Sequence, residues 1–140
     1  MATVIRPGEI DANKAYEPPL MIGFGIDSST IENPPAAMGK TVIPPGAKNQ
    51  SHRHEASDAC IHIFSGRLRF LFGDPGTERR EEIAEGGDFV HIPRGEAHGV
   101  ENVSDTEEVH LVFCYPGVPD SDAAITVMLE GEDVIQEPGA

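Results

Sequence analysis

Two stretches decide the fold: residues 46–66 read GAKNQSHRHEASDACIHIFSG, and residues 87–102 read GDFVHIPRGEAHGVEN. Their apolar runs are too short for ordinary helices, and glycine and proline lie between them, a pattern typical of strands. The same pattern extends outward through a chain with 12 prolines and 15 glycines. It predicts eight short strands, at residues 21–26, 38–43, 59–64, 68–72, 88–92, 98–103, 109–115 and 125–129. Such a set indicates an all-β sandwich or barrel.

The length of 140 residues predicts one domain spanning residues 1–140. We expect residues 1–27 to contribute N-terminal strands that form a homodimer, because the edge strands of an open sandwich need cover. Residues 131–140 are expected to be an acidic, loosely held tail. The charged run Glu78–Glu82 follows a turn signal and is expected to be a solvated hairpin.

The net charge and the hydropathy of the sequence indicate which kinds of binding partner to expect. The formal net charge is −14, which repels phosphate backbones and anionic membranes, so neither nucleic acid nor membrane is an expected partner. The sequence contains no apolar run long enough to span a bilayer and no secretory signal pattern at its start. We therefore expect a cytoplasmic protein that acts on a small molecule.

Three of the six histidines are candidate metal ligands. A strand displays residues i and i+2 on one face, so His52 and His54 would present two imidazoles roughly 6.6 Å apart. The Pro93–Gly95 turn would reverse the chain and return the strand of His98 to that pair. Three converging imidazoles form a nitrogen-rich site suited to a borderline divalent metal.

The spacing of the fixed residues is similar to a known family. The first stretch places its glycines and histidines at Gly46, His52, His54 and Gly66. The second places its turn residues, histidine and asparagine at Gly87, Pro93, Gly95, His98 and Asn102. Over residues 46–102 this resembles both motifs of the cupin superfamily. The resemblance implies a jelly-roll β-barrel and one divalent metal ion held by the three histidines.

The sequence departs from this family at the fourth ligand. Cupins ordinarily carry a glutamate seven residues before the glycine that is Gly66 here, and Ala59 occupies that position. The alternatives are Asp58, His62, or water beside three histidines. If the hairpin after His54 slips by one residue, His62 faces the metal; without the slip, the neighbouring isoleucines point inward and His62 points outward. We expect His62 as the fourth ligand.

A barrel of this kind does not specify a reaction, so function must be argued from the site. A metal without an acidic ligand keeps its full double charge and is a strong Lewis acid. A four-histidine site in a small cupin is similar to that of cupin-type aromatic polyketide cyclases. This likeness implies metal-assisted aldol ring closure of an apolar poly-β-ketone, with zinc favoured and iron, nickel or manganese as alternatives.

Several residues outside the histidine group are candidates for other roles. Asp58 and His91 are candidate bases for proton removal, and Gln50, which shares the parity of His52, is a candidate substrate-binding residue. Two other functions remain open. One is a dioxygenase that acts on an aromatic diol or flavonol, and the other is a non-enzymatic cupin that binds a small molecule.

Overall fold

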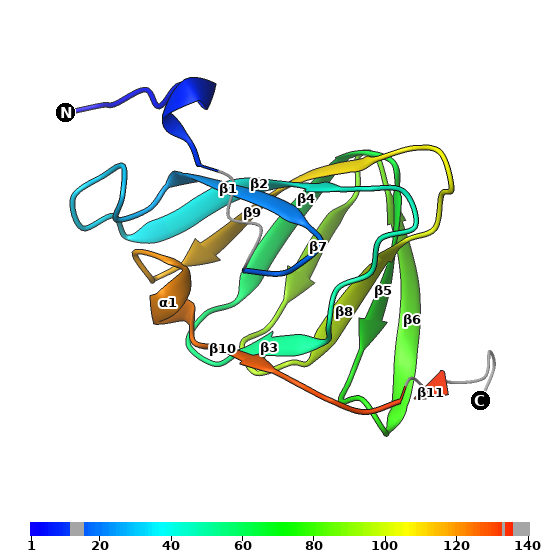
Figure 1. The fold of residues 1–140 in the computed structure, drawn as a ribbon. Helices are drawn as coiled ribbons and strands as arrows, with labels where there is room; N and C mark the ends of the chain where they lie inside the picture. Colours follow the sequence, from blue (N-terminus) through cyan, green and yellow to red (C-terminus); the bar gives the residue numbers. More distant parts are fainter. Residues whose placement is uncertain (12–15, 133, 136–140) are drawn as a thin grey trace.

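The computed structural model describes residues 1–11, 16–132 and 134–135, and it is built almost entirely of strands (Figure 1). This confirms the all-β prediction. The elements in chain order are η1 (Pro7–Glu9), β1 (Met21–Ile26), β2 (Ala36–Ile43), β3 (His52–His54), β4 (Ala59–Ser65), β5 (Arg67–Phe72), β6 (Glu78–Glu85), β7 (Phe89–Ile92), β8 (His98–Asn102), β9 (Val109–Pro116), α1 (Ser121–Ala124), β10 (Thr126–Met128) and β11 (Val134–Ile135). Among the described residues, no helix is long and apolar enough to cross a membrane.

The strands form two sheets that face one another (Figure 1). One sheet has the order β1-β2-β9-β4-β7, and the other has the order β10-β3-β8-β5-β6-β11. The pairings are antiparallel except for the parallel pairing of β11 with β6. Strands that follow one another in sequence often lie in opposite sheets, and β3 becomes the neighbour of β8. This topology brings the two motif stretches together.

The core lies between the sheets and follows from alternation along each strand. In β5, Leu68, Phe70 and Phe72 are buried, as the period of two in this segment predicts. In β9, Leu111 and Phe113 point to the same interior from the facing sheet. Each large apolar side chain of this kind contributes about 2 kcal/mol by leaving water. Apolar packing between the two sheets is therefore a large contribution to the stability of the fold.

The charged run at Glu78–Glu82 begins the second strand of a β-hairpin, as predicted, and within the run only the side chain of Arg79 is buried. The run belongs to β6, which pairs with β5 from Arg80 to Glu85. Cross-strand contacts compensate the charges: Arg69 pairs with Glu81 at 3.2 Å, and the guanidinium of Arg80 lies 4.9 Å from the ring centroid of Phe72. Cross-strand pairs of this kind stabilise a sheet although the strand itself is polar.

Two expectations about the chain ends remain predictions. Strand β1 is an edge strand of its sheet, which is compatible with a homodimer formed through residues 1–27. Within the predicted tail, residues 131–140, the structure describes only residues 131, 132, 134 and 135, and the rest lies outside the described residues.

Gly66 links β4 to β5, and its replacement by alanine is expected to destabilise the protein. Its φ is +91°, and an added Cβ would lie 2.8 Å from the carbonyl oxygen of Glu108. We expect Gly66→Ala to cost about 2–4 kcal/mol of unfolding free energy in urea titrations. Gly76→Ala is the control, because Gly76 has φ +83° but nothing within 4 Å of the new Cβ. If both variants lost the same unfolding free energy, the contact of the new Cβ with Glu108 would not be the cause.

Candidate metal centre

Three histidines meet on the inner face of the six-stranded sheet. His52 and His54 lie two residues apart on β3, and His98 on β8 is the register partner of His52. Alternation along β3 and pairing with β8 point all three side chains into the sandwich. They are 1%, 3% and 5% exposed, respectively, although histidine is seldom fully buried.

One nitrogen from each ring lies within 4.8 Å of the others, so the three imidazoles can share one ion. The Nδ1 atom of His52 lies 3.0 Å from the carbonyl oxygen of Gln50, and that of His98 lies 3.0 Å from the carbonyl oxygen of Glu96. A carbonyl only accepts hydrogen bonds, so these Nδ1 atoms carry the protons. The Nε2 lone pairs of His52 and His98 are then free for coordination.

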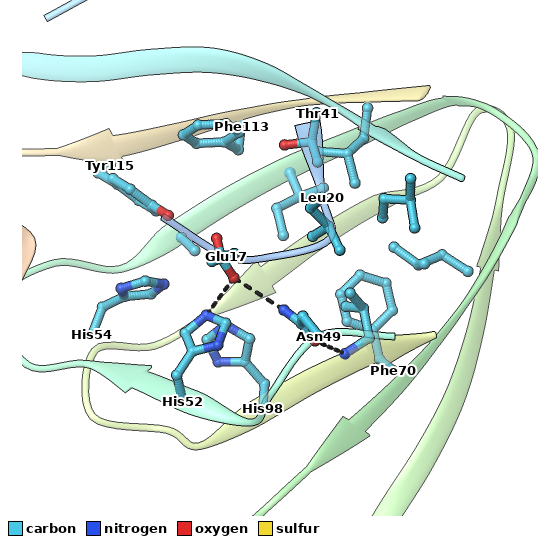
Figure 2. A pocket seen from close by; sticks show the side chains of 16 residues that line it. Glu17, Leu20, Thr41, Asn49, His52, His54, Phe70, His98, Phe113 and Tyr115 are labelled. Atoms are coloured by element: carbon cyan, nitrogen blue, oxygen red, sulfur yellow. Dashed lines mark hydrogen bonds and ion pairs between the residues drawn. The ribbon is translucent and has the colours of Figure 1, made fainter. Parts of the chain in front are cut away.

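Glu17, which the sequence analysis missed, faces this group (Figure 2). It lies just before β1 and is only 8% exposed. Its Oε1 lies 2.8 Å from the Nε2 of His52 and accepts a hydrogen bond of 3.0 Å from the Nδ2 of Asn49. No sequence motif includes this glutamate, because it precedes residues 46–66 and 87–102 and reaches the site only through tertiary folding.

The electrostatics of the group suit a cation. Burial, together with the neighbouring charge on His52, lowers the pKa values of His54 and His98 to about 3, so both are neutral ligands at ordinary pH. Burial disfavours the charged form of His52, but the Glu17 carboxylate outweighs it and raises the pKa of His52. Burial likewise opposes the charge on Glu17, and His52 lowers the pKa of that carboxyl below its ordinary value.

The donor set therefore fits a divalent transition metal. The buried Nε2 of His52 makes no hydrogen bond of acceptable geometry, although the Glu17 oxygen lies within ion-pair distance. A ring nitrogen and a carboxylate oxygen this close need a positive charge between them, which either a proton on His52 or a metal ion supplies. Neutral imidazoles with a nearby carboxylate are ligands that zinc, iron, manganese and nickel accept.

The histidines lie at the polar end of an interior cavity of about 50 Å³. The rest of its wall is mainly apolar and includes Leu20, Ile43, Phe70 and Phe113. Figure 2 shows Leu20, Phe70 and Phe113 on the side of the cavity away from the histidines. A ligand in this cavity would touch the histidines with one end and hydrocarbon side chains with the other.

A chain of hydroxyl groups connects His54 to the cavity wall. The Nδ1 of His54 lies 2.9 Å from the Oγ1 of Thr126, which lies 3.1 Å from the hydroxyl of Tyr16. The Tyr16 hydroxyl lies 3.1 Å from that of Tyr115, a residue that lines the cavity. Burial raises the pKa of Tyr16 to about 12 and that of Tyr115 well above its ordinary value. Both phenols therefore keep their protons at neutral pH.

The structure corrects the expected position of His62. Strand β3 does not pair with β4, which lies in the opposite sheet between β9 and β7, so the assumed hairpin register does not exist. Ala59 and Ile61 line the cavity, and alternation turns His62 to the outer face, where its ring centroid is 4.4 Å from that of Phe89. The cluster of candidate ligands found among the described residues contains the other three histidines and not His62.

The remaining predicted site residues also lie outside the cavity. Asp58 precedes the inward-facing Ala59 and points outward, where its Oδ2 is 3.0 Å from the Nε2 of His91 and its Oδ1 accepts a hydrogen bond from the backbone N–H of Arg94. Neither Asp58 nor His91 reaches the cavity as a base.

Gln50 does not present its side chain to the cavity either. Its side-chain amide donates a hydrogen bond to the carbonyl of Leu129. Its backbone carbonyl contacts the Nδ1 of His52 and so orients that ring.

The Asp58 contacts predict a pH-dependent contribution to stability. The hydrogen bonds from His91 and Arg94 lower the pKa of Asp58, so the contribution is present above the unfolded-state pKa of about 3.9. It is lost as pH falls through the lower folded-state value. We expect the wild type to lose more stability than Asp58→Asn between pH 6 and pH 3 in urea titrations. Asp105→Asn, at an exposed position, should lose as much unfolding free energy between pH 6 and pH 3 as the wild type. Equal losses in the wild type and both variants would show that the Asp58 contacts do not stabilise the fold.

Solved structures of other proteins share this two-sheet fold. The polyketide cyclase RemF from Streptomyces resistomycificus superposes with a TM-score of 0.72 at 16% identity, covering 93% of this chain and 87% of that one. Bacillus subtilis oxalate decarboxylase, a protein with Mn(II) centres, superposes with a TM-score of 0.66 at 21% identity over 79% of this chain. This chain spans only 28% of that enzyme.

Sequence comparison gives the family. An uncharacterized protein of Methanocaldococcus jannaschii is 25% identical over 89 residues, which are 64% of this chain and 67% of that protein. The family model for the cupin domain matches residues 39–115, which include both motifs and all three clustered histidines. Because that match covers more than half of a chain that also has the two-sheet architecture, the protein belongs to the cupin domain family.

Proposed function

We propose that this protein is a metal-dependent enzyme whose single divalent ion is held by His52, His54 and His98. The observation that carries the proposal is the orientation of these buried rings: their Nδ1 atoms are held by Gln50, Thr126 and Glu96, and the opposite edges converge at one end of the cavity. The ion, with zinc as the proposed metal, would supply Lewis acidity toward a carbonyl oxygen.

The proposed reaction is the aldol ring closure of an apolar poly-β-ketone, as in an aromatic polyketide cyclase. One proton leaves the carbon between two carbonyls and is returned to the oxygen of the carbonyl that this carbon attacks. That oxygen then leaves as water together with a second proton from the same carbon, so no proton is gained or lost overall. The apolar wall around Ile43, Phe70 and Phe113 would hold the hydrocarbon part and exclude water. The structural likeness to RemF over most of both chains supports this assignment at the level of the fold.

Tyr115 is the proposed hydrogen-bond donor to the substrate. When the Nε2 of His54 coordinates, its Nδ1 carries the proton and donates to Thr126. The Thr126 hydroxyl then donates to Tyr16, and Tyr16 donates to Tyr115. The hydroxyl hydrogen of Tyr115 is left for an oxygen in the cavity, where negative charge develops during enolate formation.

The size of the cavity limits the substrate. A cavity of about 50 Å³ is smaller than the roughly 150 Å³ cavity that accommodates benzene in an engineered protein. A polyketide would therefore insert only its reacting end, or it would displace part of the wall. Glu17 and Leu20, from the segment before β1, form one side of that wall.

The test combines elemental analysis with a small diketone. Purified protein is expected to contain about one divalent ion per chain and to accelerate closure of heptane-2,6-dione to its cyclohexenone, followed by the ultraviolet absorbance of the enone. Protein stripped with a chelator should lose this acceleration and regain it with zinc. A metal-free protein as purified, or equal rates with stripped and loaded protein, would contradict the proposal.

A cupin dioxygenase is the second candidate, and Glu17 is the observation that favours it. A carboxylate beside three histidines gives a mixed nitrogen and oxygen donor set, which also suits iron and manganese. Oxygen uptake with a catechol or flavonol by the iron-loaded protein would support this candidate. A protein that binds a diketone without metal and converts neither substrate would instead be a binding protein.

A further inference from the structure

The buried carboxylate of Glu17 lies where a fourth protein ligand would be needed. We infer that Glu17 coordinates the same ion as His52, His54 and His98, and that the segment before β1 thereby supplies the carboxylate that this sequence lacks at Ala59. The inference rests on the proposed function only for the presence of the ion. It concerns the ligand set and does not depend on which reaction is catalysed.

The distances fit shared coordination. Nitrogen and oxygen ligands bind zinc at about 2.0–2.2 Å, so two ligand atoms of one ion lie about 3 Å apart on perpendicular bonds and about 3.4 Å apart in a tetrahedral site. The Oε1 of Glu17 lies 2.8 Å from the Nε2 of His52. His52 Nε2 is the ring atom left free by the bond from Nδ1 to the Gln50 carbonyl, so the carboxylate is next to a coordinating atom.

Asn49 fixes the Glu17 carboxylate relative to the histidine strands. It is buried, and its Nδ2 donates to the Oε1 of Glu17 at 3.0 Å. Its Oδ1 accepts from the backbone N–H of Val100 at 2.8 Å, and its own N–H donates to the Val100 carbonyl at 3.2 Å. Val100 lies on β8, two residues after His98. The carboxylate is therefore tied to the strand that carries the third histidine.

Charge balance gives an independent reason. Glu17 is 8% exposed, and a buried carboxylate is costly unless a positive charge compensates it. The described residues that line the cavity include no lysine or arginine. A proton on His52 compensates the carboxylate when no ion is bound. A divalent ion held by the three histidines replaces that proton, and the resulting site keeps a net positive charge. Zinc sites with one carboxylate ligand still polarise carbonyl groups, so this ligand set is compatible with the proposed chemistry.

The residue at position 59 explains why a carboxylate ligand would have to come from another part of the chain. Ala59 is the position at which the cupin motif ordinarily carries glutamate, and its side chain lines the same cavity from β4. Alanine is too short to coordinate and leaves this side of the cavity open. Glu17 enters from the segment before β1, together with Leu20, which is buried in the core. Packing of this segment would then complete the ligand set.

The experiment measures cobalt affinity by competition with a chromophoric chelator and records the visible spectrum of the Co²⁺ protein. We expect Glu17→Gln to weaken Co²⁺ binding by about 100-fold or more and to change the d–d bands, because a neutral amide replaces a charged ligand. Glutamine keeps the oxygen that accepts from Asn49, so the fold should be retained. Glu32→Gln makes the same change at an exposed position and should match the wild type.

The outcomes separate this inference from the proposed function. Wild-type protein that binds Co²⁺, with Glu17→Gln equal to it in affinity and spectrum, would overturn the inference and leave a three-histidine metal site. Wild-type protein that binds no Co²⁺ would overturn both. Glu17→Leu is the second variant, since it tolerates burial and cannot coordinate. If Glu17→Gln folds poorly, the same loss of affinity and the same spectral change in Glu17→Leu would support coordination.

Discussion

His98→Ala is expected to lower the affinity for zinc by more than about 100-fold, which is the upper end of the losses seen when residues behind a ligand are changed. His98 supplies one of three imidazoles whose coordinating atoms lie within 4.8 Å of one another. Its Nδ1 is held by the Glu96 carbonyl, so the free Nε2 has a fixed direction that no neighbouring group can replace. The measurement is competition with a chelator at pH 7.5, with circular dichroism to verify that the strands persist.

His62→Ala and His110→Ala are the matched controls, because both histidines belong to the five-stranded sheet and neither lines the cavity. Both variants should bind zinc within about twofold of the wild type. Loss of zinc in His62→Ala with retention in His98→Ala would mean that the ion is bound elsewhere. That result would contradict both the three-histidine site and the four-histidine arrangement, because both include His98.

The three histidines were predictable because their placement depends on local rules. Alternation along a strand places His52 and His54 on one face whatever the rest of the fold does. The Pro93–Gly95 turn, with Gly95 at φ +83°, reverses the chain so that β8 can run beside β3. Residue spacing therefore carried enough information to identify this half of the site.

The fourth position was not predictable, because it depends on which strands become neighbours. His62 could face the metal only if β3 and β4 formed a hairpin. In the structure, the connection between these strands crosses to the other sheet. Glu17 lies in a turn before β1, where no periodicity indicates which way a side chain points. Its role follows from the contacts with Asn49 and His52, which only the folded chain brings together.

Strand β6 shows the same limit for the fold. A run of five charged residues carries no hydrophobic periodicity, so the sequence predicts a solvated hairpin but gives no sign that Arg79 is buried. In the structure the run is stabilised by its partner: β5 supplies Arg69 to pair with Glu81, and buried Arg79 donates hydrogen bonds to the carbonyls of Leu71 and Gly73. Stabilisation by cross-strand pairs cannot be read from the sequence of one strand, because it depends on the neighbouring strand. Here it outweighs the low strand propensity of glutamate.

Tyr115→Phe is expected to reduce the rate of diketone ring closure by about 100-fold, the size of loss found when one oxyanion donor is removed. Phenylalanine fills the same space in the wall and retains the ring contact with His54, whose centroid lies 4.8 Å away. The three histidines and their Nδ1 partners are unchanged. Zinc affinity should therefore stay within about threefold of the wild type, so the loss would lie in turnover and not in metal loading.

Tyr16→Phe distinguishes donation from packing, because it interrupts the hydroxyl chain but leaves the Tyr115 hydroxyl in the cavity wall. Tyr115 then loses the donor that fixes its orientation but keeps its own hydrogen, so the rate should fall by less than about tenfold. Equal losses in the two variants would show that the tyrosine pair acts by holding the wall in place. A loss confined to Tyr115→Phe, with zinc content unchanged, requires a hydrogen bond from that hydroxyl to the reacting molecule.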